Sequence, residues 1–338
     1  MGAGAWSETQ LAAWSGVGRA RIAALCDRHP ERREPLAQRW NISGRFGDVG
    51  AMLDGTALDF VDICTRPTSH GDLIRQVAAC GLPVLCQKPF ATSLEEACEL
   101  VEHCERAGVR LMINENYRWQ RWFRQAREVI AAGRLGRPFS ARMIRRIRFT
   151  LPRFEHAQSY LAKMPQLIVY EMGAHWLDVF RYLFGEPQSI YARTNQVSPH
   201  VQGEDVALLV LGYKDLTCTI ETSWASVPIP GIDLLPGDKT GAPRLEIEGT
   251  DATLSLACNG TLHLFSDTGH ERWHFDEHEP ARSHVAAQQH FIDCLDTGAE
   301  FETSGAAMLH TMALIHGAYL SAAENRVVEM SELLPLQH

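Results

Sequence analysis

The chain has 338 residues, of which 45% are apolar and 22% charged, and its formal net charge is -9. This length favours two domains with a sizeable core, and the acidic balance gives no overall attraction to nucleic acid or to anionic membranes. No apolar run reaches the roughly 20 residues that span a bilayer, and the first residues lack the layout of a secretory signal. We therefore expect a cytoplasmic globular protein that binds neither nucleic acid nor membrane.

The positions of the cysteines and of the clustered arginines do not indicate a functional site. The nine cysteines are scattered and contain no CxxC pair, so neither a disulfide framework nor a metal site is indicated. A local basic cluster is formed by Arg142, Arg145, Arg146 and Arg148, which we interpret as a solvated strand face.

The chain opens with MGAGAWS, in which Gly2, Gly4 and Ser7 have the spacing of a loop that binds a pyrophosphate. The helix expected over SETQLAAW would add free N–H groups and a positive dipole end. Asp27 ends an apolar run 20 residues after Ser7, where a dinucleotide fold places the acid that binds the ribose hydroxyls. A carboxylate there favours NAD, although the adjacent Arg28 leaves NADP open.

Up to about residue 115, short apolar runs alternate with longer helical patterns. Strands are expected over RIAALCD, LDFVDICT, LPVLCQKP and VRLMINE, and helices over PERREPLAQRWN, HGDLIRQVAACG and SLEEACELVEHCERAG. In the last helix, Ser93 is a plausible N-cap with Glu96 three residues later. This alternation predicts an α/β fold with a parallel doubly wound sheet.

Ligands of an open parallel sheet bind outside the carboxyl ends of its strands. That rule selects the polar strand ends, which carry Asp27, Arg28, Thr65, Pro67, His70, Gln87, Lys88, Asn116 and Arg118. Lys88 stands at such an end, where a lysine can stabilise a substrate oxygen that gains negative charge.

The second half has a different pattern, with runs of period two such as PFSARMIRRIRF, DVALLVLGYKDLTCTIETSW and RLEIEGTDATLSLACNGTLHLF. These runs predict a large, mostly antiparallel sheet, which helices around residues 165–185, 283–298 and 304–324 would cover. We expect a nucleotide-binding domain over 1–118 and an α+β domain over 119–338, with the last helix packing back on the first domain.

The segment LIVYEMGAHWLDVFRYLFG is apolar on nearly all sides, which is typical of a buried helix. Within it, Glu171, His175 and Asp178 fall at i, i+4 and i+7 and would form one polar stripe. A carboxylate one turn from a histidine can orient the imidazole as a general base. A hydrogen-bonded core network is an equally open explanation of the same stripe.

Together these motifs resemble the Gfo/Idh/MocA family, the glucose-fructose oxidoreductase and inositol dehydrogenase group, over essentially the whole chain. The resemblance rests on GAGAWS, CDRHPERR, TRPTSH, QKPFATSLEEACELVEHCERAGVRLMINENYRW, EMGAHWLD and TSGAAMLHTMALIHGAYLSAAENRVVEM. It implies an oxidoreductase that moves hydride between NAD(H) or NADP(H) and a sugar, a polyol or a related secondary alcohol, in a homodimer or homotetramer.

The resemblance also implies roles for individual residues. Lys88 and His175 would be catalytic with Glu171, and a substrate-binding group would comprise Lys88, Asn116, Arg118, Glu171, His175 and Asp178. Cofactor-binding residues would be Gly2, Gly4, Ser7, Asp27, Arg28, Thr65, Pro67, His70, Gln87 and Lys88. The alternative is a regulator of the same fold that senses a sugar or nucleotide without turnover.

Three departures from the family pattern stand out. Gln87 replaces a glutamate beside Lys88, and Glu171 replaces an aspartate. The third is that only Met1 precedes the glycine loop, where the family has a central strand. We therefore expect the native reading frame to extend upstream by roughly five to eight residues, the usual length of a strand.

Overall fold

The computed structural model describes residues 1–149, 159–233 and 241–334, and it divides into two compact units. Unit 1 comprises Met1–Asn116 with His284–Met312, and unit 2 comprises Tyr117–Ser283 with Ala313–His338. Two long helices, α8 (Glu279–Thr297) and α9 (Gly305–Glu324), contribute residues to both units. The domain boundary expected at residue 118 stays a prediction.

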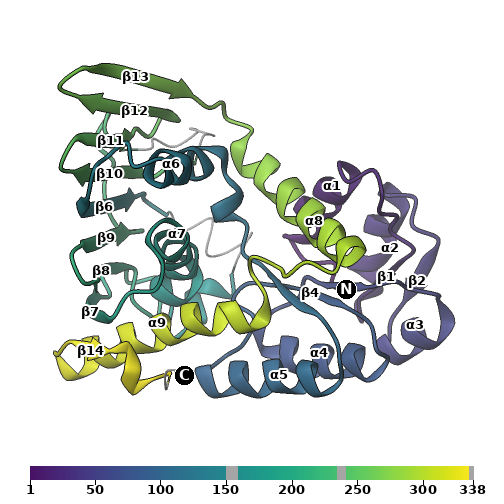
Figure 1. Cartoon of the computed structure of the whole chain (residues 1–338). Coiled ribbons are helices and arrows are strands. Elements are labelled where there is room, and N and C mark those ends of the chain that lie inside the picture. The colour runs from purple at the N-terminus through teal and green to yellow at the C-terminus, as the bar shows by residue number, and fades with distance from the viewer. Residues whose placement is uncertain (150–158, 234–240, 335–338) are drawn as a thin grey trace. The chain divides into compact units, whose positions relative to one another are not determined.

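Unit 1 alternates helices and short parallel strands, as the sequence predicts (Figure 1). Its helices are α1 (Ser7–Ser15), α2 (Pro30–Arg39), α3 (Val49–Gly55), α4 (His70–Ala79) and α5 (Leu94–Arg106). Its strands are β1 (Ala24–Cys26), β2 (Gly44–Phe46), β3 (Val61–Ile63), β4 (Val84–Gln87) and β5 (Leu111–Asn114). Strand β2 and helix α3 were not predicted from the sequence.

The strands of unit 1 pair in parallel, in the orders β1-β2 and β3-β4-β5. Every residue of β4 and β5 is buried, as expected of parallel strands covered on both faces. The predicted cap of α5 is confirmed, because the Ser93 hydroxyl accepts a hydrogen bond from the Glu96 amide. The Rossmann-like fold of this half is therefore confirmed.

Between β1 and β3, the first two residues of the chain supply the only main-chain link that the described residues show. The Met1 ammonium donates to the Asp62 carbonyl, and the Met1 carbonyl accepts from the Cys64 amide. On the other side, the Gly2 amide donates to the Cys26 carbonyl at 2.8 Å. Next to this link lies a cavity of about 250 Å³, whose wall includes Trp14.

Unit 2 is built on a sheet of nine strands in the order β13-β12-β11-β10-β6-β9-β8-β7-β14 (Figure 1). The strands are β6 (Pro138–Arg146), β7 (Ser189–Asn195), β8 (Val206–Gly212), β9 (Thr217–Ser223), β10 (Arg244–Gly249), β11 (Ala252–Leu256), β12 (Thr261–Ser266), β13 (Gly269–His274) and β14 (Val328–Glu329). All neighbours pair antiparallel except β6 and β9. The predicted large, mostly antiparallel sheet is confirmed.

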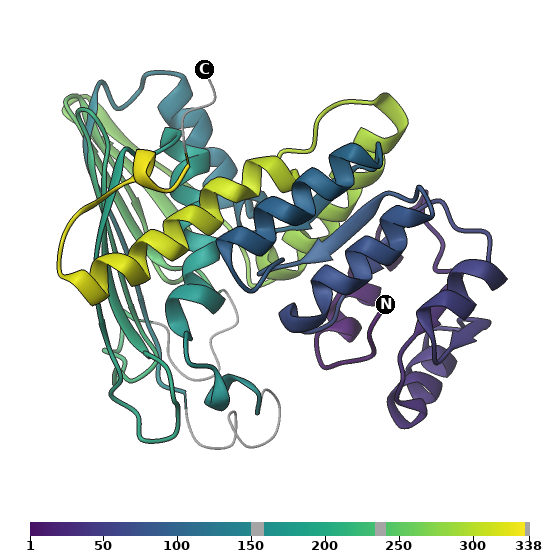
Figure 2. The same cartoon turned by 90° about the horizontal axis from the view of Figure 1, so that it is seen from below.

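Helices α6 (Arg121–Ala131) and α7 (Ala174–Phe184), together with α9, lie on one side of the large sheet (Figure 2). We call this side the inner face, and among the described residues no helix lies on the other, outer face. Alternation along β6 places the buried Ala141 and Met143 on the inner face. Arg145 shares that face, so interpreting all four clustered arginines as a solvated face was wrong for this residue.

Candidate active site

The glycine loop crosses the carboxyl ends of β1 and β3 and leads into α1. Gly2 has a φ of 92°, and a Cβ there would lie 2.2 Å from the Cys64 carbonyl oxygen, so only glycine fits. A Cβ on Gly4 would meet nothing within 4 Å, which leaves that stretch of backbone open to a ligand. Ser7 stands where a third glycine is usual, and its hydroxyl donates to the Gly2 carbonyl at 3.0 Å.

The Asp27 carboxylate is held at the end of β1 by main-chain donors. Its Oδ2 accepts from the Ala3 amide at 2.7 Å, and its Oδ1 accepts from the His29 amide at 2.8 Å. Asp27 therefore ties the glycine loop to the start of α2. The exposed Arg28 donates from Nε to His29 Nε2 at 3.1 Å.

The loop after β3 is joined to the end of β4 by a buried imidazole. His70 Nε2 lies 3.1 Å from the Thr65 carbonyl oxygen, and its Nδ1 lies 3.1 Å from the Pro89 carbonyl oxygen. Burial lowers the pKa of His70, and its contacts with the two carbonyls only partly oppose that shift. His70 thus links the turn at Pro67–Ser69 to the strand end that carries Lys88.

Gln87 ends β4 with a side chain that is 6% exposed, and its Nε2 has no hydrogen-bond partner among the described residues. A buried amide donor without a partner is costly, so this group fits a polar ligand atom. Lys88 follows it and is partly exposed. Together with the open backbone at Gly4 and the start of α1, these residues fit a bound dinucleotide.

The helix that carries the second group of predicted residues is not a single α-helix. Val169–Gly173 forms a π-helical turn, and α7 begins only at Ala174. Glu171 lies in the π turn, whereas His175 and Asp178 lie in α7, so a continuous α-helix does not join Glu171 to His175, and the polar stripe stays a prediction. A π turn changes the direction of a side chain relative to an α-helix, and such turns are frequent at functional sites.

His175 is 4% exposed, and the ring of Tyr117 covers it. The two ring centroids lie 3.9 Å apart with the planes at 12°, so the imidazole is held by stacking. Tyr117 belongs to a short 3-10 turn, Tyr117–Trp119, just before α6. Tyr117 was not predicted as a site residue, although it lies between the predicted residues Asn116 and Arg118.

The next residue of the same turn anchors it to α7. Arg118 Nε donates to Asp178 Oδ2 at 2.8 Å, and its Nη2 donates to Oδ1 at 2.6 Å. Asp178 is fully buried and Arg118 is 7% exposed, while Arg181 adds a second cation 3.7 Å from the carboxylate. Both partners were expected to contact substrate, which stays a prediction. The observed pair holds Tyr117 against His175.

A second buried carboxylate supports the segment that leads into α7. Glu204 accepts hydrogen bonds from the Leu167 and Val169 amides, at 3.1 Å and 3.0 Å, and from the Tyr319 hydroxyl at 2.6 Å. The negative charge thus lies at the start of a helical segment, where the helix dipole favours it. The sequence analysis missed Glu204, because the strand pattern around it gives no signal for a helix partner 35 residues away.

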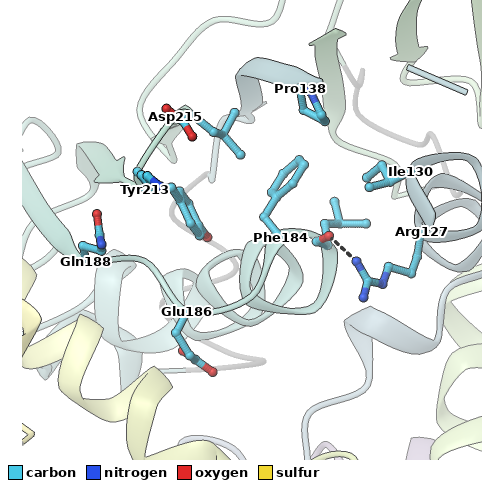
Figure 3. Close-up of a pocket in the computed structure, with 11 residues that line it drawn as sticks. Arg127, Ile130, Pro138, Phe184, Glu186, Gln188, Tyr213 and Asp215 are labelled. Atoms are coloured by element: carbon cyan, nitrogen blue, oxygen red, sulfur yellow. Dashed lines mark hydrogen bonds between the residues drawn. The ribbon is translucent and has the colours of Figure 1, made fainter. Parts of the chain in front are cut away.

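A cavity of about 430 Å³ opens at the other end of α7, roughly 12 Å along the helix from His175. Arg127, Phe184 and Tyr213 are among the residues that line it (Figure 3). Arg127 donates to the Leu183 carbonyl there, at 2.8 Å.

In the described part of the chain, no group of three His, Cys, Asp or Glu side chains could hold a metal ion. No helix in the described ranges is long and apolar enough to cross a bilayer.

Comparison with known proteins agrees with this geometry. Residues 1–115 match an oxidoreductase family with an NAD-binding Rossmann fold, so the chain is an oxidoreductase that uses NAD or NADP. Residues 123–255 match the C-terminal domain of the GFO/IDH/MocA proteins. The chain therefore belongs to the GFO/IDH/MocA family, and the predicted family and enzyme class are confirmed.

Three relatives show how far the likeness extends. A D-apiose dehydrogenase of Rhizobium rhizogenes is 35% identical, with 99% of this chain and 97% of the relative covered. An inositol 2-dehydrogenase of Rhizobium meliloti is 24% identical, with 98% of each covered. An oxidoreductase of Agrobacterium radiobacter, solved with NAD+, L-tartaric acid and magnesium, is 35% identical with a TM-score of 0.90 and 98% of each chain covered. None of the three supports the alternative of a regulator without turnover.

Proposed function

We propose that the protein oxidises a secondary alcohol, or the hemiacetal carbon, of a sugar or polyol, and that it can run the reaction in reverse. His175 takes the hydroxyl proton, and Lys88 stabilises the oxygen as it gains negative charge. A nicotinamide bound at the strand ends of unit 1 would supply the acceptor for the hydride that leaves the same carbon. Proton and hydride together account for the two electrons and two hydrogens that the alcohol loses.

The observation that carries this proposal is the fixed position of His175. A proton acceptor must be held within hydrogen-bond reach of the hydroxyl, and stacking on Tyr117 restrains the imidazole plane. Glu171 orients the ring in this proposal, while Asn116 and Arg118 shape the substrate loop. Asp178 acts through Arg118, because its carboxylate is fully buried.

The sugar-dehydrogenase names of the relatives guide the choice of substrate. D-apiose dehydrogenases are 35% and 36% identical to this chain over almost its whole length. Branched and linear pentoses are therefore the first substrates to test, and inositols are the second. NAD is the proposed cofactor, since the fixed Asp27 carboxylate would repel the 2'-phosphate of NADP.

We also propose a homodimer or homotetramer in the cytoplasm. The outer face of the large sheet has no helix on it among the described residues, and it exposes Leu208 and Phe265 by 39% and 47%. Sheet faces of this kind pair readily with a second copy. All nine cysteines are free thiols, which suits a reducing compartment.

The test is the absorbance of reduced nicotinamide, measured with the purified protein and a panel of pentoses and inositols. Lys88→Met and His175→Ala should each lower kcat by a factor of about 100 or more, because each removes one role in the proton and charge transfer. Lys214→Met and His316→Ala change exposed side chains of the same types and should leave the rate unchanged. Turnover that neither Lys88→Met nor His175→Ala slows would refute the assignment.

A further inference from the structure

Arg145 differs from its neighbours in the basic stretch of β6. Arg142 and Arg146 lie on the outer face and pair with Glu246 and Glu221, at 3.9 Å and 2.7 Å. Arg145 lies on the inner face, in the row of Ala141 and Met143, where alternate side chains of β6 are buried. The strand therefore sends one arginine of three toward the side that carries α7.

On the inner face, few polar contacts compensate the charge of the Arg145 guanidinium for its loss of water. Within the described ranges it makes no ion pair, and its one hydrogen bond runs from Nη1 to the Ala242 carbonyl at 3.4 Å. Burial lowers the pKa of Arg145, and the Tyr117 phenol partly opposes this shift. An arginine has five N–H donors, so at this position it can still bind an anionic oxygen pair.

A second unsatisfied group lies next to it. Thr222 on β9 is the register partner of Arg145 on β6, so the two side chains project from the same face. Thr222 is 2% exposed, and its Oγ1 has no hydrogen-bond partner among the described residues. A buried hydroxyl that lacks a partner costs about 1–3 kcal/mol, which a ligand oxygen would offset.

Tyr117 connects Arg145, the register partner of Thr222, to the proposed catalytic histidine. Its ring stacks on His175 with centroids 3.9 Å apart, and its phenol acts electrostatically on Arg145. The imidazole and the cation are therefore both linked to one tyrosine within unit 2, and Thr222 lies beside the cation on the same face of the sheet.

We propose that Arg145 and Thr222 form a subsite for a carboxylate of the ligand that His175 contacts. The guanidinium donates to the two carboxylate oxygens, and the Thr222 hydroxyl donates to one of them. The substrates or products then include hydroxy acids and sugar acids, and not neutral polyols alone. This inference rests on the proposed function, since it assumes that the reacting molecule lies beside His175.

The experiment compares two probes with one carbon skeleton, the diacid L-tartrate and the neutral polyol L-threitol. Calorimetric titration of the whole protein saturated with NAD should show at least tenfold tighter binding of tartrate. Arg145→Met should abolish this preference, whereas Arg145→Lys should keep part of it, because lysine retains the charge but not the planar pair of donors. Thr222→Val, which preserves shape, should weaken tartrate binding several-fold.

Arg142→Met is the matched control, since Arg142 lies on the opposite face of the same strand and should leave both affinities unchanged. Equal binding of the two probes by the natural protein, or no tartrate binding, would overturn the subsite. So would an Arg145→Met variant that still prefers tartrate. NAD binding and turnover of a neutral sugar, measured on the same variants, report separately on the proposed function.

Discussion

Asp27 shows at the scale of one residue how a side chain can serve the fold and the cofactor together. Its two oxygens accept from the Ala3 and His29 amides, at 2.7 Å and 2.8 Å. The carboxylate therefore cannot turn away from the end of β1. A ribose diol can donate to such a carboxylate, whereas a 2'-phosphate would meet like charge.

Asp27→Asn tests this electrostatic discrimination with little change of shape. We expect the preference for NADH over NADPH to fall by a factor of about 10, because the amide keeps an acceptor but removes the charge that repels the phosphate. Titrations that follow the fluorescence of each reduced cofactor give both affinities. Asp48→Asn is the control, since Asp48 caps α3 at the Ala51 amide. An unchanged NADH to NADPH ratio in Asp27→Asn would count against the role of Asp27.

At the scale of elements, an ion pair and a ring stack join the turn Tyr117–Trp119 to helix α7. Arg118 donates twice to Asp178, and the same turn presents Tyr117 to His175. Removing one partner of a buried ion pair leaves the other charged and unpaired, which typically destabilises a protein by about 3–5 kcal/mol. The pair thus contributes to both the stability of unit 2 and the position of the imidazole.

Asp178→Asn should therefore lower the free energy of unfolding by about 3 kcal/mol or more, as measured by denaturant titration. Asp72→Asn is a suitable control, because Asp72 lies 4.0 Å from Arg75 in an exposed pair and should change stability by less than about 1 kcal/mol. If kcat falls while KM for the sugar stays constant, Asp178 acts by positioning His175. Equal stabilities of the two variants would contradict this account.

The sequence pattern predicted helices and strands correctly where a single rule, such as an N-cap or an apolar run, determines the structure. The Ser93 cap, the strands β4 and β5 and the start of α1 at Ser7 all followed from spacing and composition. The π turn did not, because a π turn and an α-helix share the same apolar pattern. Strand β2 was missed because Gly44–Phe46 holds a single apolar side chain, whereas the equally short β1 and β3 lie within apolar runs.

At the scale of the whole molecule, the family pattern identified the fold and the enzyme class, and it selected most of the candidate residues. The family pattern did not identify contacts between residues that are far apart in the sequence. Tyr117, Glu204 and Arg145 owe their importance to contacts that sequence spacing does not encode. Arg145 is the clearest case, since a run of arginines on one strand gives no sign of which member faces inward.

The cavity of about 250 Å³ beside Met1 lies against the main-chain link that joins β1 to β3. Hydrostatic pressure favours states that eliminate internal void volume, and the larger cavity of unit 2 is more open to solvent, so we expect unit 1 to yield to pressure before unit 2. Trp14 lies in the cavity wall, while Trp176 is 1% exposed on α7, so their indole N–H resonances report on the two units separately. We expect the Trp14 resonance to be lost at the lower pressure, and NAD to raise that pressure by binding the folded state.

Simultaneous loss of both resonances would show that the cavity carries no such weakness. If the Trp14 resonance is lost first, the pressure at which it is lost measures how stably the end of β1, which carries Asp27, is held to β3. Pressure would then modulate cofactor affinity with no change in the residues that touch the cofactor.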